Sequence, residues 1–165
     1  MEMLPVNFND ALFVATNMRE WDKKEIYATR WTDDPSDIAQ DCVNLGEFGW
    51  IAYDPEPIAL VGAVPCHPGV WNVHMFATDN FSKIAISLTK FVKNVIVPSL
   101  TAIGSHRVEC KSMDGHEDAH KWLEFLGRTG SQRFQSTAKK TKTFIYMFGE
   151  DNVHERPKNT KRQLG

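Results

Sequence analysis

The 165-residue sequence has only three cysteines, Cys42, Cys66 and Cys110, and no two of them form a Cys-x-x-Cys pair. This excludes a disulfide framework and a closely spaced cysteine metal site, and it favours a reducing compartment. No run of about 18 uninterrupted apolar residues is present, so we expect no membrane-spanning helix. The first ten residues lack the basic segment and the apolar stretch of a secretory signal, and we expect none there.

The apolar residues that are present suffice for a folded domain, because 42% of the residues are hydrophobic and 24% are charged. The formal net charge is only −2, but the charges are unevenly distributed. Residues 1–58 carry twelve acidic and four basic side chains, whereas residues 59–165 carry nine acidic and fifteen basic ones. A near-neutral total therefore does not exclude an anionic partner for the second part.

Hydrophobic periodicity and turn residues predict a mixed α/β fold with helices on the faces of one sheet. Pro98 is expected to kink or end the long central helix. The expected elements are helices at 10–17, 19–29 and 35–42, strands at 50–53, 58–64 and 71–77, a long helix at 84–95, a strand at 106–111, a helix that ends at Gly127, and a hairpin of 133–137 with 143–148.

No internal repeat or low-complexity linker divides the sequence, so we predict a single domain over residues 1–148. Residues 1–46 form its helical part and residues 47–148 its sheet. Residues 149–165 are polar and lack a periodic pattern, which predicts a flexible tail. Four basic residues lie between Arg156 and Arg162, but without interleaved aromatic side chains they do not indicate nucleic-acid binding.

Five short segments are similar to GNAT-like proteins of short-tailed bacteriophages, within an element order that resembles GNAT-type N-acetyltransferases over residues 47–148. The segments are His-Pro-Gly-Val-Trp at 67–71, Phe-Ala-Thr-Asp at 76–79, Leu-Thr-Lys-Phe at 88–91, Gly-Ser-His-Arg at 104–107 and Ala-His-Lys-Trp-Leu-Glu-Phe-Leu-Gly at 119–127. The resemblance implies a mixed, mostly antiparallel sheet with helices on both faces. It also implies that strands 71–77 and 106–112 splay apart and form a V-shaped cleft for acyl-CoA.

The same resemblance implies transfer of an acetyl group from acetyl-CoA to an amine of a host protein or small molecule, in the host cytoplasm or the virion. The pyrophosphate of the co-substrate would lie at the start of the next helix, where free N–H groups favour anions. No glycine lies between Thr78 and Leu88, although the family has a glycine-rich loop there, and Leu123 occupies the place of a frequent tyrosine acid. The implied cofactor-binding residues are Phe76, Ala77, Thr78, Phe81, Ser82, Lys83 and Ile84.

Acetyl transfer to an amine needs a base that removes a proton from an ammonium group near the thioester. His74 and Glu109, on the two splayed strands, are the candidates for this base. Ser112, at the end of the second strand, is a candidate to hydrogen-bond the pantetheine or the tetrahedral intermediate. Each of these residues can instead be an ordinary polar side chain at a sheet edge or helix start.

Two other functions remain open. The missing glycines and tyrosine favour a GNAT frame without catalysis, which serves as a structural or interaction protein in a virion or binds a host factor. His116, Glu117 and His120 satisfy the pattern H-E-x-x-H, which on one helix face predicts a zinc hydrolase. The longer H-x-x-G-x-x-H continuation is missing, and the position of His116 at the start of a helix favours a structural role, so we assign no metal ligands.

Overall fold

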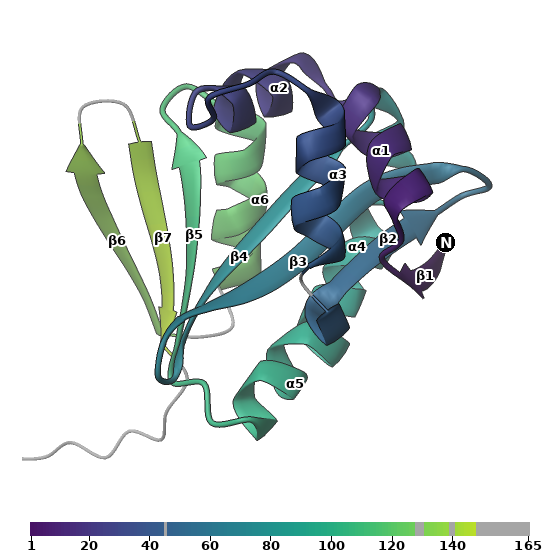
Figure 1. Ribbon diagram of the computed structural model, residues 1–165. Coiled ribbons are helices and arrows are strands. Elements are labelled where there is room, and N and C mark those ends of the chain that lie inside the picture. The colour runs from purple at the N-terminus through teal and green to yellow at the C-terminus, as the bar shows by residue number, and fades with distance from the viewer. Residues whose placement is uncertain (45, 128–130, 139–140, 148–165) are drawn as a thin grey trace, which may run out of the picture.

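A computed structural model describes residues 1–44, 46–127, 131–138 and 141–147 (Figure 1). One seven-stranded sheet has the order β1-β2-β3-β4-β5-β7-β6, and every neighbouring pair except β4 and β5 is antiparallel. The predicted mixed, mostly antiparallel sheet is confirmed. The strands are β1 (Glu2–Pro5), β2 (Gly49–Tyr53), β3 (Pro57–His67), β4 (Val70–Ala77), β5 (Arg107–Met113), β6 (Ser131–Ala138) and β7 (Thr141–Met147).

Helices cover both faces of this sheet (Figure 1). Leu60 of β3 packs with the first group of helices and its neighbour Val61 packs with the second, because successive strand side chains point to opposite faces. The first group is α1 (Phe8–Thr16), α2 (Glu20–Tyr27) and α3 (Pro35–Val43). The second group is the 3-10 helix η2 (Asp79–Lys83), α4 (Ala85–Phe91), the π-helix η3 (Val92–Ile96), α5 (Val97–Ala102) and α6 (Glu117–Gly127).

The three N-terminal helices form where the sequence predicts them. The Asp34 side chain accepts a hydrogen bond of 2.8 Å from Ser36 N, and Pro35 occupies the first turn of α3. Both features are typical of helix starts, because Pro lacks an N–H and the capping carboxylate satisfies a free one. In α1 the side chain of Asn7 has the same role and accepts a 3.1 Å bond from Asp10 N.

The long helix does not end at Pro98, and the disturbance near the proline takes the form of a π-helical turn. The helical path continues to Ala102, because a π-helical turn, η3, precedes the proline. In that turn the Val97 N–H donates to the Val92 carbonyl, five residues back. The wider turn makes room where the proline ring would otherwise clash with a carbonyl of the preceding turn.

Strands β4 and β5 are parallel but pair only at their starts, through Val70–Arg107, Trp71–Val108 and Asn72–Glu109. Beyond these pairs β4 continues beside β3 and β5 continues beside β7, so the two strands diverge (Figure 1). Gly69 holds the closed end: its carbonyl accepts bonds from His106 N and Arg107 N, at 3.0 and 3.2 Å. The predicted splay of the central strands is confirmed.

Strand β1 is absent from the sequence prediction. Only one of its four residues is even partly buried, so no alternation of apolar and polar residues marks it. The predicted closing hairpin is present as β6 and β7, whereas the predicted tail at 149–165 lies outside the described residues. Among the described helices none has the length and apolar character needed to cross a bilayer.

Candidate active site

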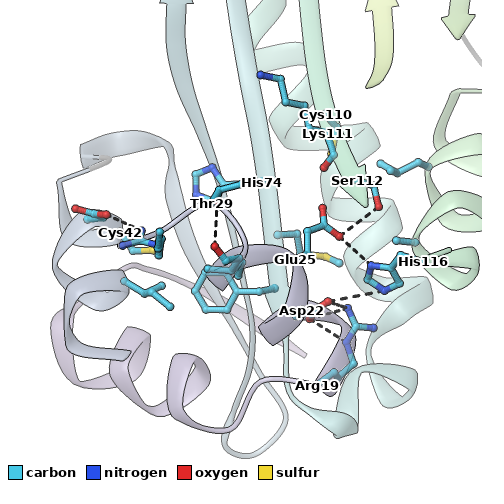
Figure 2. A pocket seen from close by; sticks show the side chains of 18 of the residues that line it. Arg19, Asp22, Glu25, Thr29, Cys42, His74, Cys110, Lys111, Ser112 and His116 are labelled. Carbon is cyan, nitrogen blue, oxygen red and sulfur yellow. Dashed lines mark hydrogen bonds and ion pairs between the residues drawn. The ribbon is translucent and has the colours of Figure 1, made fainter. Parts of the chain in front are cut away.

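A pocket of about 380 Å³ lies where the pairing of β4 and β5 ends (Figure 2). Strand β4 contributes His74, Met75 and Phe76 to its wall, and β5 contributes residues 110–112. Side chains of α2, α3 and α6 close the remaining sides. The pocket therefore occupies the V-shaped gap that the splayed strands create.

The free edge of β4 faces this gap through alternate backbone groups. Thr78 N donates to Ile58 O of β3 at 2.8 Å, so the backbone groups of Ala77 and Met75 point away from β3. Those of Ala77 are occupied: its N–H donates to the Asp22 carboxylate at 2.8 Å, and its carbonyl accepts from Arg19 N at 2.9 Å. The backbone of Met75 faces the part of the gap from which β5 has already diverged.

Asp22 is the centre of a buried ion pair beside the pocket. Its carboxylate is 4% exposed and accepts two 3.0 Å hydrogen bonds from the Arg19 guanidinium. Burial raises the pKa of Asp22 above its ordinary value, although Arg19 and the Ala77 N–H act in the opposite direction. The pair thereby ties the start of α2 to the end of β4.

Glu25 points from α2 into the gap between the two strands (Figure 2). Its Oε2 lies 3.0 Å from His116 Nδ1 and accepts a 3.4 Å hydrogen bond from the Ser112 hydroxyl. The buried His116 ring stacks on Trp21, with ring centroids 5.5 Å apart, and its Nε2 lies 3.9 Å from Asp22 Oδ1. This cluster joins residues far apart in the chain and was not predicted from the sequence.

Of the three predicted catalytic residues, the structure places His74 and Ser112 on the pocket wall and Glu109 elsewhere. Burial lowers the pKa of His74 to about 4, so its imidazole is neutral at pH 7. Ser112 is 2% exposed and is bound to Glu25. Glu109 is paired with Asn72 at the closed end of the strands, and its Oε1 lies 2.6 Å from Arg107 Nη2, so it does not face the pocket.

The predicted cofactor-binding residues lie along the end of β4 and the turn that follows it. Phe76 lines the pocket, and the Thr78 hydroxyl is a buried polar atom without a hydrogen-bond partner in the described residues. Ser82 and Lys83 are exposed, whereas the Ile84 side chain is 0% exposed and belongs to the core. A ligand contact by Ile84 would therefore be made through its backbone.

Phe81, within this turn, packs against two residues that line the pocket. The Arg19 guanidinium lies 4.7 Å from its ring centroid, and the Trp122 ring meets its ring edge-on at 6.1 Å. A bulky aromatic residue thus stands where the resembling family has glycine. The turn is a 3-10 helix without glycine, the residue that lets a backbone approach a phosphate closely.

The histidines of the H-E-x-x-H pattern bind different partners. His116 contacts Glu25, while His120 Nε2 lies 3.0 Å from the Met113 carbonyl oxygen. No group of three His, Cys, Asp or Glu side chains with metal-binding geometry is found within the described ranges. Burial also raises the pKa of the Cys110 thiol to about 12, so this thiol is protonated at neutral pH.

Solved structures of known proteins share this fold. The GNAT domain of S. lividans PAT has a TM-score of 0.66 and 14% identity, covering 88% of this chain and 89% of that one. Ard1 from Thermoplasma volcanium has a TM-score of 0.66 and 8% identity, covering 90% of this chain and 98% of that one. Aminoglycoside 6'-acetyltransferase type Ii has a TM-score of 0.63 and 14% identity, covering 89% of this chain and 97% of that one.

This chain has the GNAT fold. No family model and no curated protein sequence matches it, so the likeness is one of structure. The diverging β4 and β5 are the two strands that the sequence predicts to splay apart, and the pocket described above lies between them.

The burial of His74 predicts a dependence of stability on pH. The unfolded chain binds a proton at this side chain below about pH 6.5, whereas the folded chain does so only near pH 4. Stability is therefore complete above pH 6.5 and is lost as the pH falls toward 4. Relative to His74→Gln, the unmodified protein should lose about 2 kcal/mol between pH 7 and pH 4.5 in urea unfolding. His67→Gln, at the exposed end of β3, is the control, and parallel pH curves for all three proteins would contradict the prediction.

Proposed function

We propose that this protein transfers an acyl group from acyl-CoA, with acetyl-CoA as the natural donor, to an amine bound in the pocket between β4 and β5. The observation that carries the proposal is the divergence of the two strands after Asn72 and Glu109. It opens a pocket of about 380 Å³ and leaves the Met75 backbone facing it. The GNAT fold of the solved relatives supports the same reaction class.

Two features of the β4 edge fit such a donor. The Met75 N–H and carbonyl can pair with the amides of a pantetheine arm, as a neighbouring strand would. At the end of β4 the buried Thr78 hydroxyl is a polar atom that a ligand can satisfy. Lys83 is exposed close to it in sequence and is the proposed phosphate contact, with Ser82 beside it.

The residues of the pocket provide the surroundings for transfer. Bound acyl-CoA supplies the thioester. Trp122 and Leu123 of α6 exclude water from the pocket wall, and neutral His74 can exchange a hydrogen bond with the acceptor without adding charge. Ser112 is proposed to donate to the reacting carbonyl when its bond to Glu25 is exchanged.

Acetyl-CoA binding tests the proposal directly. A ligand that binds only the folded state stabilises it by about 2.7 kcal/mol at a hundred times its Kd. We therefore expect a clear rise in the thermal unfolding midpoint at millimolar acetyl-CoA, and a smaller rise with desulfo-CoA lacking the acyl group. A midpoint unchanged by either compound would overturn the proposal, and release of free CoA thiol upon amine addition would support catalysis.

A second candidate is a GNAT-fold protein without acyl transfer that acts through binding to a virion or host protein. The turn after β4 favours it, because Phe81 and Asp79 stand where a phosphate would need close backbone approach. The acetyl-CoA titration separates the two candidates, because a protein without acyl transfer would show no change in its thermal unfolding midpoint with acetyl-CoA.

The origin, location and acceptor of the protein are proposed from the sequence resemblance. We propose that the chain is phage-encoded, that it acts in the host cytoplasm or is carried in the virion, and that its acceptor is a host protein or a small amine. The segments at 67–71 and 119–127 support this origin. Mass spectrometry of infected cells with and without the protein would identify the acylated species.

A further inference from the structure

We propose that Glu25 binds the ammonium group of the acceptor and takes its proton, and that His116 and Ser112 position it. This inference rests on the proposed acyl transfer and names the substrate class of the same pocket as an alkylammonium. It begins from the charges on the pocket wall. Among the residues described, Asp22 is paired with Arg19 and Asp41 with Arg30, but Glu25 has no arginine or lysine partner.

The carboxylate of Glu25 is held on one oxygen and open on the other. Its Oε2 contacts His116 Nδ1 at 3.0 Å and Ser112 Oγ at 3.4 Å, whereas its second oxygen points into the gap between β4 and β5 (Figure 2). The side chain is 27% exposed, which leaves the open oxygen accessible. A fixed carboxylate with one available oxygen is the arrangement that a general base needs.

Among the groups that surround it, Glu25 provides the negative charge that an incoming cation meets. His116 faces it from the start of α6, Asp22 lies on the far side of His116, and Cys110, Lys111 and His74 come from the two strands. The negative charge of Glu25 contributes to the raised pKa of Cys110, although burial is the larger cause, so the carboxylate lies close to the wall formed by β5.

The rest of the pocket selects the acceptor class. Ile26, Phe76 and Leu123 provide apolar walls. Of the three carboxylates among the described pocket residues, the one on Glu25 has no arginine or lysine partner. This combination fits an alkyl chain that ends in a primary ammonium, as in a diamine or a lysine side chain. Both sources present the same group to Glu25.

The proton and electron balance is complete with these groups. The ammonium gives one proton to the Glu25 carboxylate and becomes a neutral amine. The amine nitrogen forms the C–N bond with the thioester carbonyl carbon, the C–S bond breaks, and the sulfur keeps that electron pair. The second amine proton ends on the CoA thiol, and the proton on Glu25 returns to solvent.

Glu25→Gln tests the inference, with Glu20→Gln on the exposed side of the same helix as the matched control. Calorimetry with cadaverine, in the presence of CoA, should show binding to the unmodified protein and to Glu20→Gln. Binding to Glu25→Gln should be at least about tenfold weaker, because a charged hydrogen bond is lost. A blocked lysine peptide replaces cadaverine in a second arm and shows whether a free diamine or a protein side chain is preferred.

Transfer rates provide the second readout. At pH 7, kcat/KM for cadaverine should fall about 100-fold in Glu25→Gln. The deficit should shrink as the pH approaches 10, because the amine then loses its proton without help. For the positioning role, His116→Ala should lower kcat, and His116→Asn, whose amide can still donate to Glu25, should restore most of it.

The outcomes separate the two proposals. Amine binding and transfer that are equal in Glu25→Gln and Glu20→Gln, or no binding of either cadaverine or the lysine peptide by the unmodified protein, would overturn the role of Glu25. If acetyl-CoA fails to bind while cadaverine binding depends on Glu25, the acyl transfer fails and the ammonium site stands. Thermal unfolding of each variant confirms that the fold is retained.

Discussion

Replacement of Asp22 by alanine is expected to lower the free energy of unfolding by about 3 kcal/mol. The change removes the partner of the Arg19 guanidinium and the acceptor of the buried Ala77 N–H. A buried donor without a partner costs about 1–3 kcal/mol, and loss of one member of a buried ion pair costs more. Since domains of this size are stable by only about 5–15 kcal/mol, urea unfolding should show the effect plainly.

Two matched variants show whether the position or the charge is responsible. Asp22→Asn keeps an acceptor for the Ala77 N–H and should cost about 1 kcal/mol. Asp118→Ala removes an exposed carboxylate whose side chain is 90% accessible and should change stability by less than about 0.5 kcal/mol. Equal losses for Asp22→Ala and Asp118→Ala would contradict the structural role of the pair.

Replacement of Cys110 by tryptophan is expected to abolish acetyl-CoA binding. Cys110 follows the last β5 residue that pairs with β4 and lines the pocket, so an indole there fills the point at which the strands separate. We expect the Kd to rise more than about 100-fold, which corresponds to about 2.7 kcal/mol of lost binding energy. Isothermal calorimetry with acetyl-CoA measures this change.

Cys66→Trp is the control for this substitution. Cys66 is exposed near the end of β3, so the same chemical change there leaves the pocket open. Overpacking at Cys110 costs about 1–3 kcal/mol of stability, and the binding experiment must be done below the unfolding midpoint of the variant. Normal acetyl-CoA affinity in Cys110→Trp would show that the donor binds elsewhere.

Helix caps, prolines and the spacing of apolar residues predicted most of the helices and strands, because these signals act through neighbouring residues. The Asp34 cap and Pro35 mark the start of α3, and the spacing of Ile84, Leu88 and Val92 marks a buried helix face. Such signals do not reveal how a segment ends when the backbone adapts. Pro98 was expected to kink or end the helix, and the helical path instead continues past it to Ala102 after a π-helical turn.

The site was only partly predictable, because its polar contacts join distant segments. His74 and Ser112 were found from their strands, yet the partner of Ser112 is Glu25, 87 residues away. A weak signal was present: Asp22 and Glu25 are three residues apart and therefore share a face of α2. That pattern is equally typical of a solvated helix, and only the packing of α2 against β4 and α6 distinguishes the two.

The hydrogen bond from Ala77 N to Asp22, which spans 55 residues, gives the molecule an internal reporter. Its amide proton exchanges with solvent only when α2 separates from the end of β4, so its exchange rate measures how often the site opens. Because Asp22 and Glu25 lie one helical turn apart on α2, each such opening also removes the carboxylate from the gap. The exchange of a single backbone proton can therefore be followed as a measure of site integrity in the absence of any substrate.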